Sequence, residues 1–255
     1  MREQGRLRKG AIIVSAHAQA SLLVMSALLA GATAGCGGDG PEAAPKTPAP
    51  PSTASPSAPT YTKAQLKSSL LPPQDIDKNL RSRSINFQGL SKQSVPTCSD
   101  SSVRVAEPQW SSVRQFADTS SLYATRYAQF AAVYDDAASA QREFDKIRTA
   151  AHKCPTKGHV DSERVSENRI RLGYDYTWSM REDSITGWRL LRSSLEKTAK
   201  AAGKSNTLSS AIDYGIRGNA LIASIYWKRL PPGKSGDSIS KEATEILTKQ
   251  LQKIG

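Results

Sequence analysis

Adjacent acidic residues are the first candidates for acid–base chemistry in this sequence of 255 residues, and they occur as Asp135-Asp136 and Glu182-Asp183. A general acid and a general base must converge on one reacting group, whereas neighbouring side chains point apart. The first pair can also cap a helix, and the second can form a turn. The motifs Gly-x-Ser-x-Gly and His-Glu-x-x-His do not occur. The sequence therefore predicts no catalytic residue and a protein that is not an enzyme.

The N-terminus has the order of charge and hydropathy that is typical of a secretory signal peptide. Basic residues dominate the first nine positions, and no charged residue lies between Gly10 and Gly35. The uncharged run ends in Thr33-Ala34-Gly35-Cys36, which resembles the lipobox of bacterial lipoproteins. The resemblance implies a signal peptide over residues 1–35 and a Cys36 that carries a diacylglyceryl group. A plain cleaved signal peptide and a retained transmembrane helix are the alternatives, since about 20 apolar residues can span a bilayer.

Residues 36–60 are expected to form a lipidated cysteine followed by a linker. Half of the chain's 14 prolines fall in this segment, and Ala, Ser, Thr and Gly fill most of the rest. Such a composition favours extended spacing of about 3 Å per residue, or roughly 70 Å over the linker. More than one acyl chain on Cys36 would give stable anchoring. We therefore expect a domain tethered to the outer face of the cell membrane.

Residues 61–255 are long enough to form a single domain. A Thr-x-x-Gln capping box at Thr62 predicts a short first helix, and apolar residues spaced three and four apart predict helices over 136–153 and 238–254, the last capped by Ser238. Alternation of apolar and polar residues predicts strands over 121–134, 169–180, 188–195, 211–216 and 220–227, with a connection over 181–187. This order predicts an α+β, two-layer domain, mainly an antiparallel sheet with helices packed on one face.

The strand predicted over 169–180 alternates regularly, so one of its faces is expected to be buried, including Ile170 and Leu172. Aromatic residues of this face and of neighbouring strands form a candidate cleft for an apolar or sugar-like ligand: Tyr174, Tyr176, Trp178, Trp188 and Trp227. The alternative, which the alternation itself favours, is that these residues form the core beneath the helices.

Several features of this domain occur together in one known family. An alanine-rich helix follows Asp135-Asp136 and ends in His152-Lys153-Cys154-Pro155, Cys98 precedes it, and a hairpin containing Arg217-Gly218-Asn219 follows. The arrangement resembles the PknH-type extracellular sensor-domain family, which occurs outside some bacterial serine/threonine kinases and in stand-alone lipoproteins of actinomycetes. The resemblance covers most of residues 61–255 and implies a domain that binds a ligand or partner outside the membrane. A second cysteine pair, common toward the C-terminus of members, is absent from this sequence.

If the protein is exported, its three cysteines can be assigned to two different roles. With Cys36 acylated, Cys98 and Cys154 remain as an even pair in an oxidising setting, which favours a disulfide over two separate buried thiols. His152, Cys154 and His159 are spaced somewhat like metal ligands. Because the disulfide uses Cys154, too few ligands remain, and the sequence predicts neither a metal ion nor a cofactor.

The net charge of +12 favours polyanionic partners. On an exported domain, these are anionic lipids, glycans or wall polymers, whereas nucleic acid is not expected because the arginines do not form one cluster. We expect a membrane-anchored cell-envelope lipoprotein with a non-enzymatic extracellular sensor or ligand-binding domain. The alternatives are a hydrolase or transferase that acts on envelope polymers, and a purely structural lipoprotein.

Overall fold

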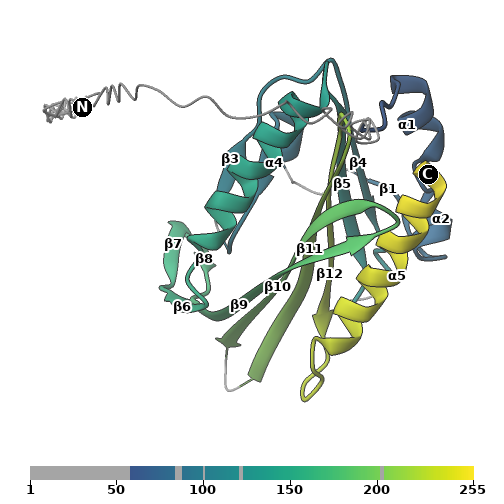
Figure 1. The fold of residues 1–255 in the computed structure, drawn as a ribbon. Coiled ribbons are helices and arrows are strands. Elements are labelled where there is room, and N and C mark those ends of the chain that lie inside the picture. The colour runs from purple at the N-terminus through teal and green to yellow at the C-terminus, as the bar shows by residue number, and fades with distance from the viewer. Residues whose placement is uncertain (1–57, 84–87, 100, 121–122, 202–203) are drawn as a thin grey trace, which may run out of the picture. The chain divides into compact units, whose positions relative to one another are not determined.

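The computed structural model describes residues 58–83, 88–99, 101–120, 123–201 and 204–255 (Figure 1). The expected signal peptide and almost all of the expected linker, including Cys36, lie outside the described residues.

The strands are β1 (Arg81–Ser82), β2 (Ser94–Pro96), β3 (Ser102–Arg104), β4 (Trp110–Ala117), β5 (Arg126–Val133), β6 (Lys157–Val160), β7 (Glu163–Ser166), β8 (Arg169–Arg171), β9 (Tyr174–Ile185), β10 (Trp188–Ala201), β11 (Lys204–Arg217) and β12 (Ala220–Leu230).

Eight of these strands form one antiparallel sheet in the order β1-β4-β5-β12-β11-β10-β9-β6. Strands β2 and β3 pair with each other, and so do β7 and β8. The helices are α1 (Lys63–Ser69), α2 (Pro73–Ile76), α3 (Gln88–Ser91), α4 (Ala137–His152) and α5 (Asp237–Ile254). The fold is therefore α+β with a large antiparallel sheet, as the sequence predicts.

Helices α1 and α4 begin where the local sequence predicts. The Thr62 hydroxyl accepts a hydrogen bond from the Gln65 amide at 3.3 Å, and the Gln65 side chain accepts one from the Thr62 amide at 2.8 Å. The Asp136 carboxylate accepts a hydrogen bond from the Ser139 amide at 2.6 Å. This bond lowers the pKa of Asp136 because it stabilises the ionised form.

Both faces of the central strands are buried. Along β5, Ala128, Phe130 and Ala132 pack with residues of α4. The alternate residues Ala131 and Val133 pack instead with residues of α1 and α5. Strand β12 shows the same division, so the two central strands are apolar almost throughout.

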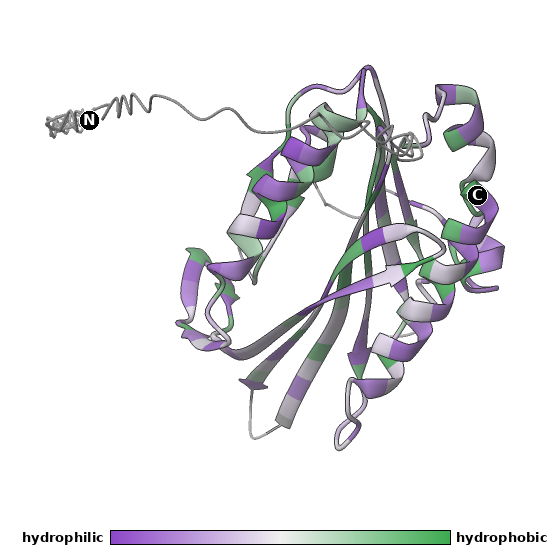
Figure 2. Cartoon of the chain, viewed as in Figure 1, coloured by the Kyte–Doolittle hydropathy of each residue, from purple (hydrophilic) through white to green (hydrophobic). Residues whose placement is uncertain are grey.

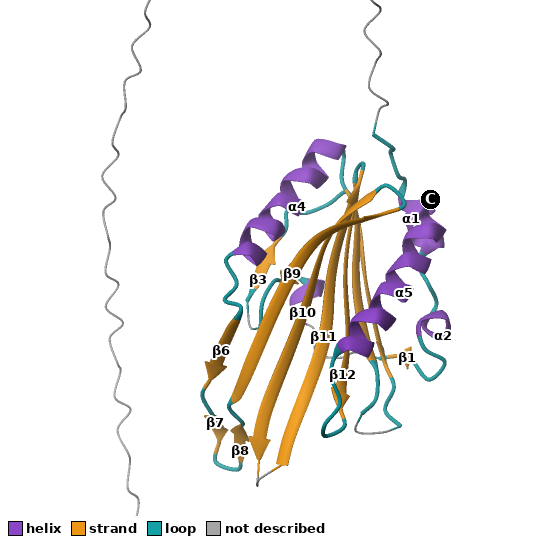
Figure 3. Cartoon of the chain, turned by 60° about the horizontal axis from the view of Figure 1, so that its bottom comes forward, coloured by secondary structure: helices purple, strands orange, loops and turns teal. Residues whose placement is uncertain are grey.

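The expectation that the helices share one face of the sheet is therefore wrong. Helix α4 covers one face, and α1 and α5 cover the other, which gives three layers (Figures 1 and 3). Periodicity identifies the apolar side of each helix, but it does not say which face of the sheet that side meets. The run of apolar residues from Ala220 to Tyr226, interrupted only by Ser224, was the available signal, because a strand covered on one side alternates.

The strand expected over 169–180 is also shifted. Strand β9 continues to Ile185, and the chain reverses at Thr186 and Gly187, whose φ angles are 48° and 80°. Positive φ at both residues is typical of a two-residue hairpin turn. Because β6 pairs only with residues 174–177, the rest of β9 lies at the sheet edge, where charged residues are tolerated. Ile170 and Leu172, expected in the core, are exposed: Ile170 lies in β8 of the separate hairpin β7–β8, and Leu172 follows that strand directly.

Helix α5 begins one residue before the expected cap. Gly236 precedes the first turn, and its amide donates a hydrogen bond to the Glu196 carboxylate at 2.9 Å. The prediction that Ser238 caps the helix is therefore wrong. The carboxylate that accepts this hydrogen bond belongs to strand β10, 40 residues earlier in the chain, so no local sequence pattern could have predicted the contact.

Asn219, in the turn between β11 and β12, ties the start of the domain to the sheet. Its side chain accepts a hydrogen bond from the Tyr61 amide at 2.7 Å. The same side chain donates to the carbonyls of Tyr61 at 3.1 Å and Tyr134 at 3.0 Å. Since Asn219 is only 4% exposed, these backbone groups have little access to water.

Replacing Asn219 by alanine is expected to lower the free energy of unfolding by about 3 kcal/mol, because it leaves buried backbone groups without partners. Urea unfolding followed by circular dichroism measures this loss. The matched control is Asn79→Ala, since Asn79 is exposed, and it should change stability by less than about 0.5 kcal/mol. Equal stability of the two variants would contradict the role given to Asn219.

Candidate functional site

A row of polar residues crosses the sheet beneath α5. Strand register places Arg192 of β10 opposite Arg181 of β9 and Asp213 of β11. The row continues through Ser224 of β12 and Gln129 of β5. It divides the apolar contacts on this face into two clusters, one around Trp188 and Leu251 and one around Phe116 and Ile246. The face beneath α4 has a single continuous cluster instead.

The centre of the row is a buried ion pair. The Nε of Arg192 donates to the Asp213 carboxylate at 3.0 Å, and the two side chains are 7% and 3% exposed. The same guanidinium donates to Thr244 of α5 at 2.6 Å and to Asp183 at 3.4 Å. Burial raises the pKa of Asp213, and the neighbouring Arg192 offsets part of this rise. A charged pair in this position is tolerated because hydrogen bonds satisfy the guanidinium.

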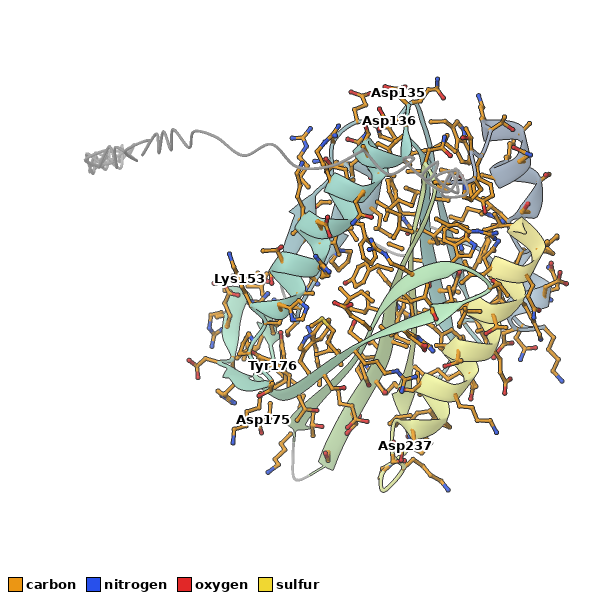
Figure 4. All side chains as sticks on the ribbon, viewed as in Figure 1. Asp135, Asp136, Lys153, Asp175, Tyr176 and Asp237 are labelled. Carbon is orange, nitrogen blue, oxygen red and sulfur yellow. A yellow bond between two sulfur atoms is a disulfide. The ribbon has the colours of Figure 1, made fainter. Side chains whose placement is uncertain are left out.

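The polar row opens into a pocket at the N-terminal end of α5. The pocket has a volume of about 370 Å³, and strands β9 to β11 form its floor. Its polar lining comes from Ser179, Arg181, Arg192, Ser193, Ser194, Asp213, Asp237 and Ser240. Asp237 lies at the start of α5, far from Asp135 and Asp136 at the start of α4 (Figure 4).

The chemistry of this pocket is that of hydrogen bonding to a polar molecule. Its size falls within the range of small-molecule sites. Arg181 is exposed there and can pair with an anionic group, while the serine hydroxyls and Asp237 can bond to hydroxyl groups. The residues that line it include no histidine or cysteine. The arrangement suits binding of a hydroxyl-rich ligand with an anionic group.

The structure separates the five aromatic residues of the expected cleft. Trp178 is buried in the core beneath α4, and Tyr176 and Trp227 pack partly exposed against that core. Trp188 is buried on the other face, where its ring stacks on Tyr61 with centroids 5.8 Å apart. The five therefore do not line one cleft.

Tyr174 has a different environment from the other aromatic residues. The Nζ of Lys197 lies 4.7 Å from the centre of the Tyr174 ring and donates to the Ser99 carbonyl at 2.7 Å. The loop after Cys98 is thus held against this end of the sheet. Ligand contact by Tyr174, Tyr176 or Trp227 stays a prediction.

The expected pairing of Cys98 with Cys154 is present as a disulfide, with the Cα atoms 5.8 Å apart. It joins the segment after β2 to the second residue after the C-terminal end of α4. The alternative of two separate thiols is wrong for the described structure. Cys36, the expected lipidation site, lies outside the described residues.

The acidic pair Glu182-Asp183 lies within β9 rather than in a turn. Glu182 lies 3.8 Å from Arg148 of α4, whereas Asp183 lies 3.4 Å from Arg192 on the face beneath α5. The two carboxylates point to opposite faces, so they do not share a reacting group. The expectation of a turn role is wrong, because the chain turns three residues later.

His159 is paired with carboxylates at the outer edge of the sheet. Its Nδ1 lies 2.8 Å from Asp175, and its Nε2 lies 3.4 Å from Asp161. The hydrogen bond with Asp175 raises the pKa of His159. No group of three or more histidine, cysteine or acidic side chains in the described part of the chain is placed to hold a metal ion.

Arg192 and Asp213 were not predicted as site residues from the sequence, although a signal was present. Each is a charged residue inside a strand whose neighbours are mostly apolar, Trp188 to Leu195 and Ala211 to Ile216. Fully buried charged residues are rare unless they are paired. Two such residues on adjacent predicted strands could have been matched to each other, but the pocket beside them depends on where α5 lies.

Comparison with known proteins gives a distant likeness to a solved structure. No protein-family model matches the chain, and no curated protein sequence matches it at a significant level. The solved extracellular domain of PknH from Mycobacterium tuberculosis matches 78% of this chain and 98% of its own length. The identity is 9% and the TM-score is 0.45. This likeness is too remote to transfer a site or a function, so the proposals below depend on the residues of this chain.

Replacing Asp213 by asparagine is expected to lower the free energy of unfolding by about 3 kcal/mol, because Arg192 is left charged and buried without its main partner. The double variant Arg192→Met with Asp213→Leu removes both charges and should recover most of this loss. Urea unfolding at neutral pH measures both. A single variant as stable as the unchanged protein would contradict the role given to the pair.

Proposed function

We propose that this protein is a lipid-anchored cell-envelope lipoprotein whose domain binds a polar ligand outside the cytoplasm. The pocket at the start of α5 is the observation that carries ligand binding. It offers the exposed guanidinium of Arg181 next to a fixed polar surface made by Arg192 and Asp213. Envelope glycans and muropeptides combine hydroxyl and carboxylate groups, and they are the ligand class that this lining suits best.

The disulfide supports the proposed compartment. Bonds such as Cys98–Cys154 form and persist in oxidising environments and are rare in the cytosol. Among the residues described, no helix is long and apolar enough to cross a membrane. The sequence Thr33-Ala34-Gly35-Cys36 supplies the proposed anchor. Acyl groups on Cys36 would then hold the domain at the outer face of the membrane.

Two carboxylates in the pocket, Asp213 and Asp237, are the observation that favours a hydrolase as the alternative. The Asp213 carboxylate forms an ion pair with Arg192, which stabilises its negative charge. Asp237 accepts a hydrogen bond from the Ser235 hydroxyl at 3.0 Å and lies in the first turn of α5, where negative charge is favoured. Because both carboxylates have structural partners, we propose binding without turnover.

The anchor is tested by metabolic labelling with radioactive palmitate in the native host. The unchanged chain is expected to incorporate label and to fractionate with membranes. Cys36→Ser should abolish labelling because no thiol remains for the thioether bond. Incorporation of label into Cys36→Ser would refute the assignment, and Cys98→Ser serves as the control for loss of an unrelated cysteine.

The pocket is tested by measuring ligand-induced shifts in melting temperature with envelope glycans and muropeptides. A bound compound raises the melting temperature by mass action. Arg181→Gln is expected to weaken binding of an anionic hit by roughly tenfold, because it removes a charge-assisted hydrogen bond. Arg229→Gln is the matched control, since Arg229 is an exposed strand residue that does not line the pocket.

Two results would contradict the proposed binding function. The first is that no compound in the set shifts the melting temperature. The second is that every compound that binds has the same affinity for Arg181→Gln as for the unchanged protein. Release of product from a bound glycan, lost in Asp237→Asn, would establish the hydrolase instead.

A further inference from the structure

The hairpin β7–β8 carries most of the exposed large hydrophobic side chains. Four such side chains occur in the described part of the chain, and three of them are Val165, Ile170 and Leu172, which are 53%, 55% and 45% exposed. The fourth is Tyr123, at 41%. Single exposed hydrophobic residues are ordinary, but a group within eight positions marks a contact surface.

The hairpin interleaves these apolar residues with arginines. Register places Arg164 opposite Ile170 and Glu163 opposite Arg171, and a bulge at Val165 interrupts the pairing. Arg171 forms an ion pair with Glu163, and the Arg164 guanidinium donates to the Glu167 carbonyl at 2.9 Å. Figure 2 shows hydrophobic and strongly hydrophilic residues along this hairpin.

The base of the hairpin is fixed to the sheet. The Gly173 amide donates to the Ser162 hydroxyl at 2.7 Å. A Cβ at Gly173 would lie 2.8 Å from the Val160 carbonyl oxygen, so the two chain segments approach closely only because this residue is glycine. The exposed residues are therefore presented by a defined structure that is continuous with β6 and β9.

Charge around the hairpin is weakly positive. Between positions 153 and 172 there are five basic residues and three acidic ones, and the acidic ones are Asp161, Glu163 and Glu167. Lys153 lies at the end of α4 (Figure 4), and Lys157 is the first residue of β6. Glu163 pairs with Arg171 and Asp161 faces His159, so the segment keeps a net charge of +2, with Lys153, Lys157 and Arg169 among its basic residues.

We propose that the β7–β8 hairpin contacts an anionic lipid bilayer, with Val165, Ile170 and Leu172 inserted at the headgroup boundary and the basic residues at the lipid phosphates. Apolar residues interleaved with arginine suit this boundary, since long basic side chains reach the polar layer while their stems pack on apolar groups. The choice of a bilayer rests on the proposed anchoring at Cys36. A chain of roughly 70 Å contour length between anchor and domain leaves this hairpin within reach of the same membrane.

The contact is tested without the anchor, using the chain that begins at position 36 and carries Cys36→Ser. Co-sedimentation with vesicles of equal parts phosphatidylglycerol and phosphatidylcholine is expected to show binding that falls with salt. The triple variant Val165→Ser, Ile170→Ser and Leu172→Ser should bind at least about tenfold more weakly, because each aliphatic side chain that is fully buried in the bilayer contributes about a decade or more. Tyr123→Ser, which removes the exposed hydrophobic residue outside the hairpin, should bind normally.

A second measurement reports insertion directly. An added tryptophan in Ile170→Trp should be quenched by brominated lipid, whereas one in Tyr123→Trp should not. Melting temperatures of all variants should match, since these side chains are exposed. The proposal is overturned if the unanchored chain does not bind the vesicles, or if the triple variant binds as well as Tyr123→Ser. Because no acyl group is present, these results leave the palmitate test of Cys36 independent.

Discussion

A guanidinium and a carboxylate buried side by side in a sheet must neutralise each other, and this requirement on Arg192 and Asp213 shapes the face beneath α5. The pair fixes β10 against β11, because a slip of β10 by one residue would turn Arg192 to the apolar face under α4 and leave Asp213 buried without its partner. It also holds α5 in place through Thr244. The polar row around it keeps the two apolar clusters of this face apart, and the pocket forms where the row reaches the sheet's outer strands.

The two faces of the sheet therefore have different roles. The face beneath α4 is a continuous core closed at one end by the Cys98–Cys154 disulfide. The face beneath α5 combines packing with polar contacts and leaves strands β9 and β10 partly uncovered next to the helix start. A site on the second face can accept a polar ligand without opening the main core.

Much of the fold could be predicted from local sequence, because the signals were local. The capping groups of Thr62 and Asp136 set the starts of two helices, and Asn219 marked the hairpin between β11 and β12. Contacts between residues far apart in the chain could not be predicted in this way. Glu196 of β10 accepts a hydrogen bond from the Gly236 amide just before α5, and the side of the sheet that a helix covers is decided by the whole core.

The candidate site was harder to predict than the fold. The alternation that includes Tyr174 and Trp178 was correct, yet alternation alone does not separate a core face from a cleft. The predicted strand also wrongly included Ile170 and Leu172, since Gly173 separates these residues from β9. The pocket residues come from three strands and a helix and share no sequence pattern.

The junction around Asn219 has a mechanical consequence. Tyr61 is bonded through its backbone to the turn between the two central strands, and its hydroxyl donates to the Gly255 carbonyl at 3.0 Å. Arg217, at the end of β11, donates to the same carbonyl. A pull applied to the chain ahead of Tyr61 would therefore load the central strands and the end of α5 together before it could peel α1 away. Such a load would be borne by the central strands of the sheet, and the polar pocket at the other end of α5 would keep its shape.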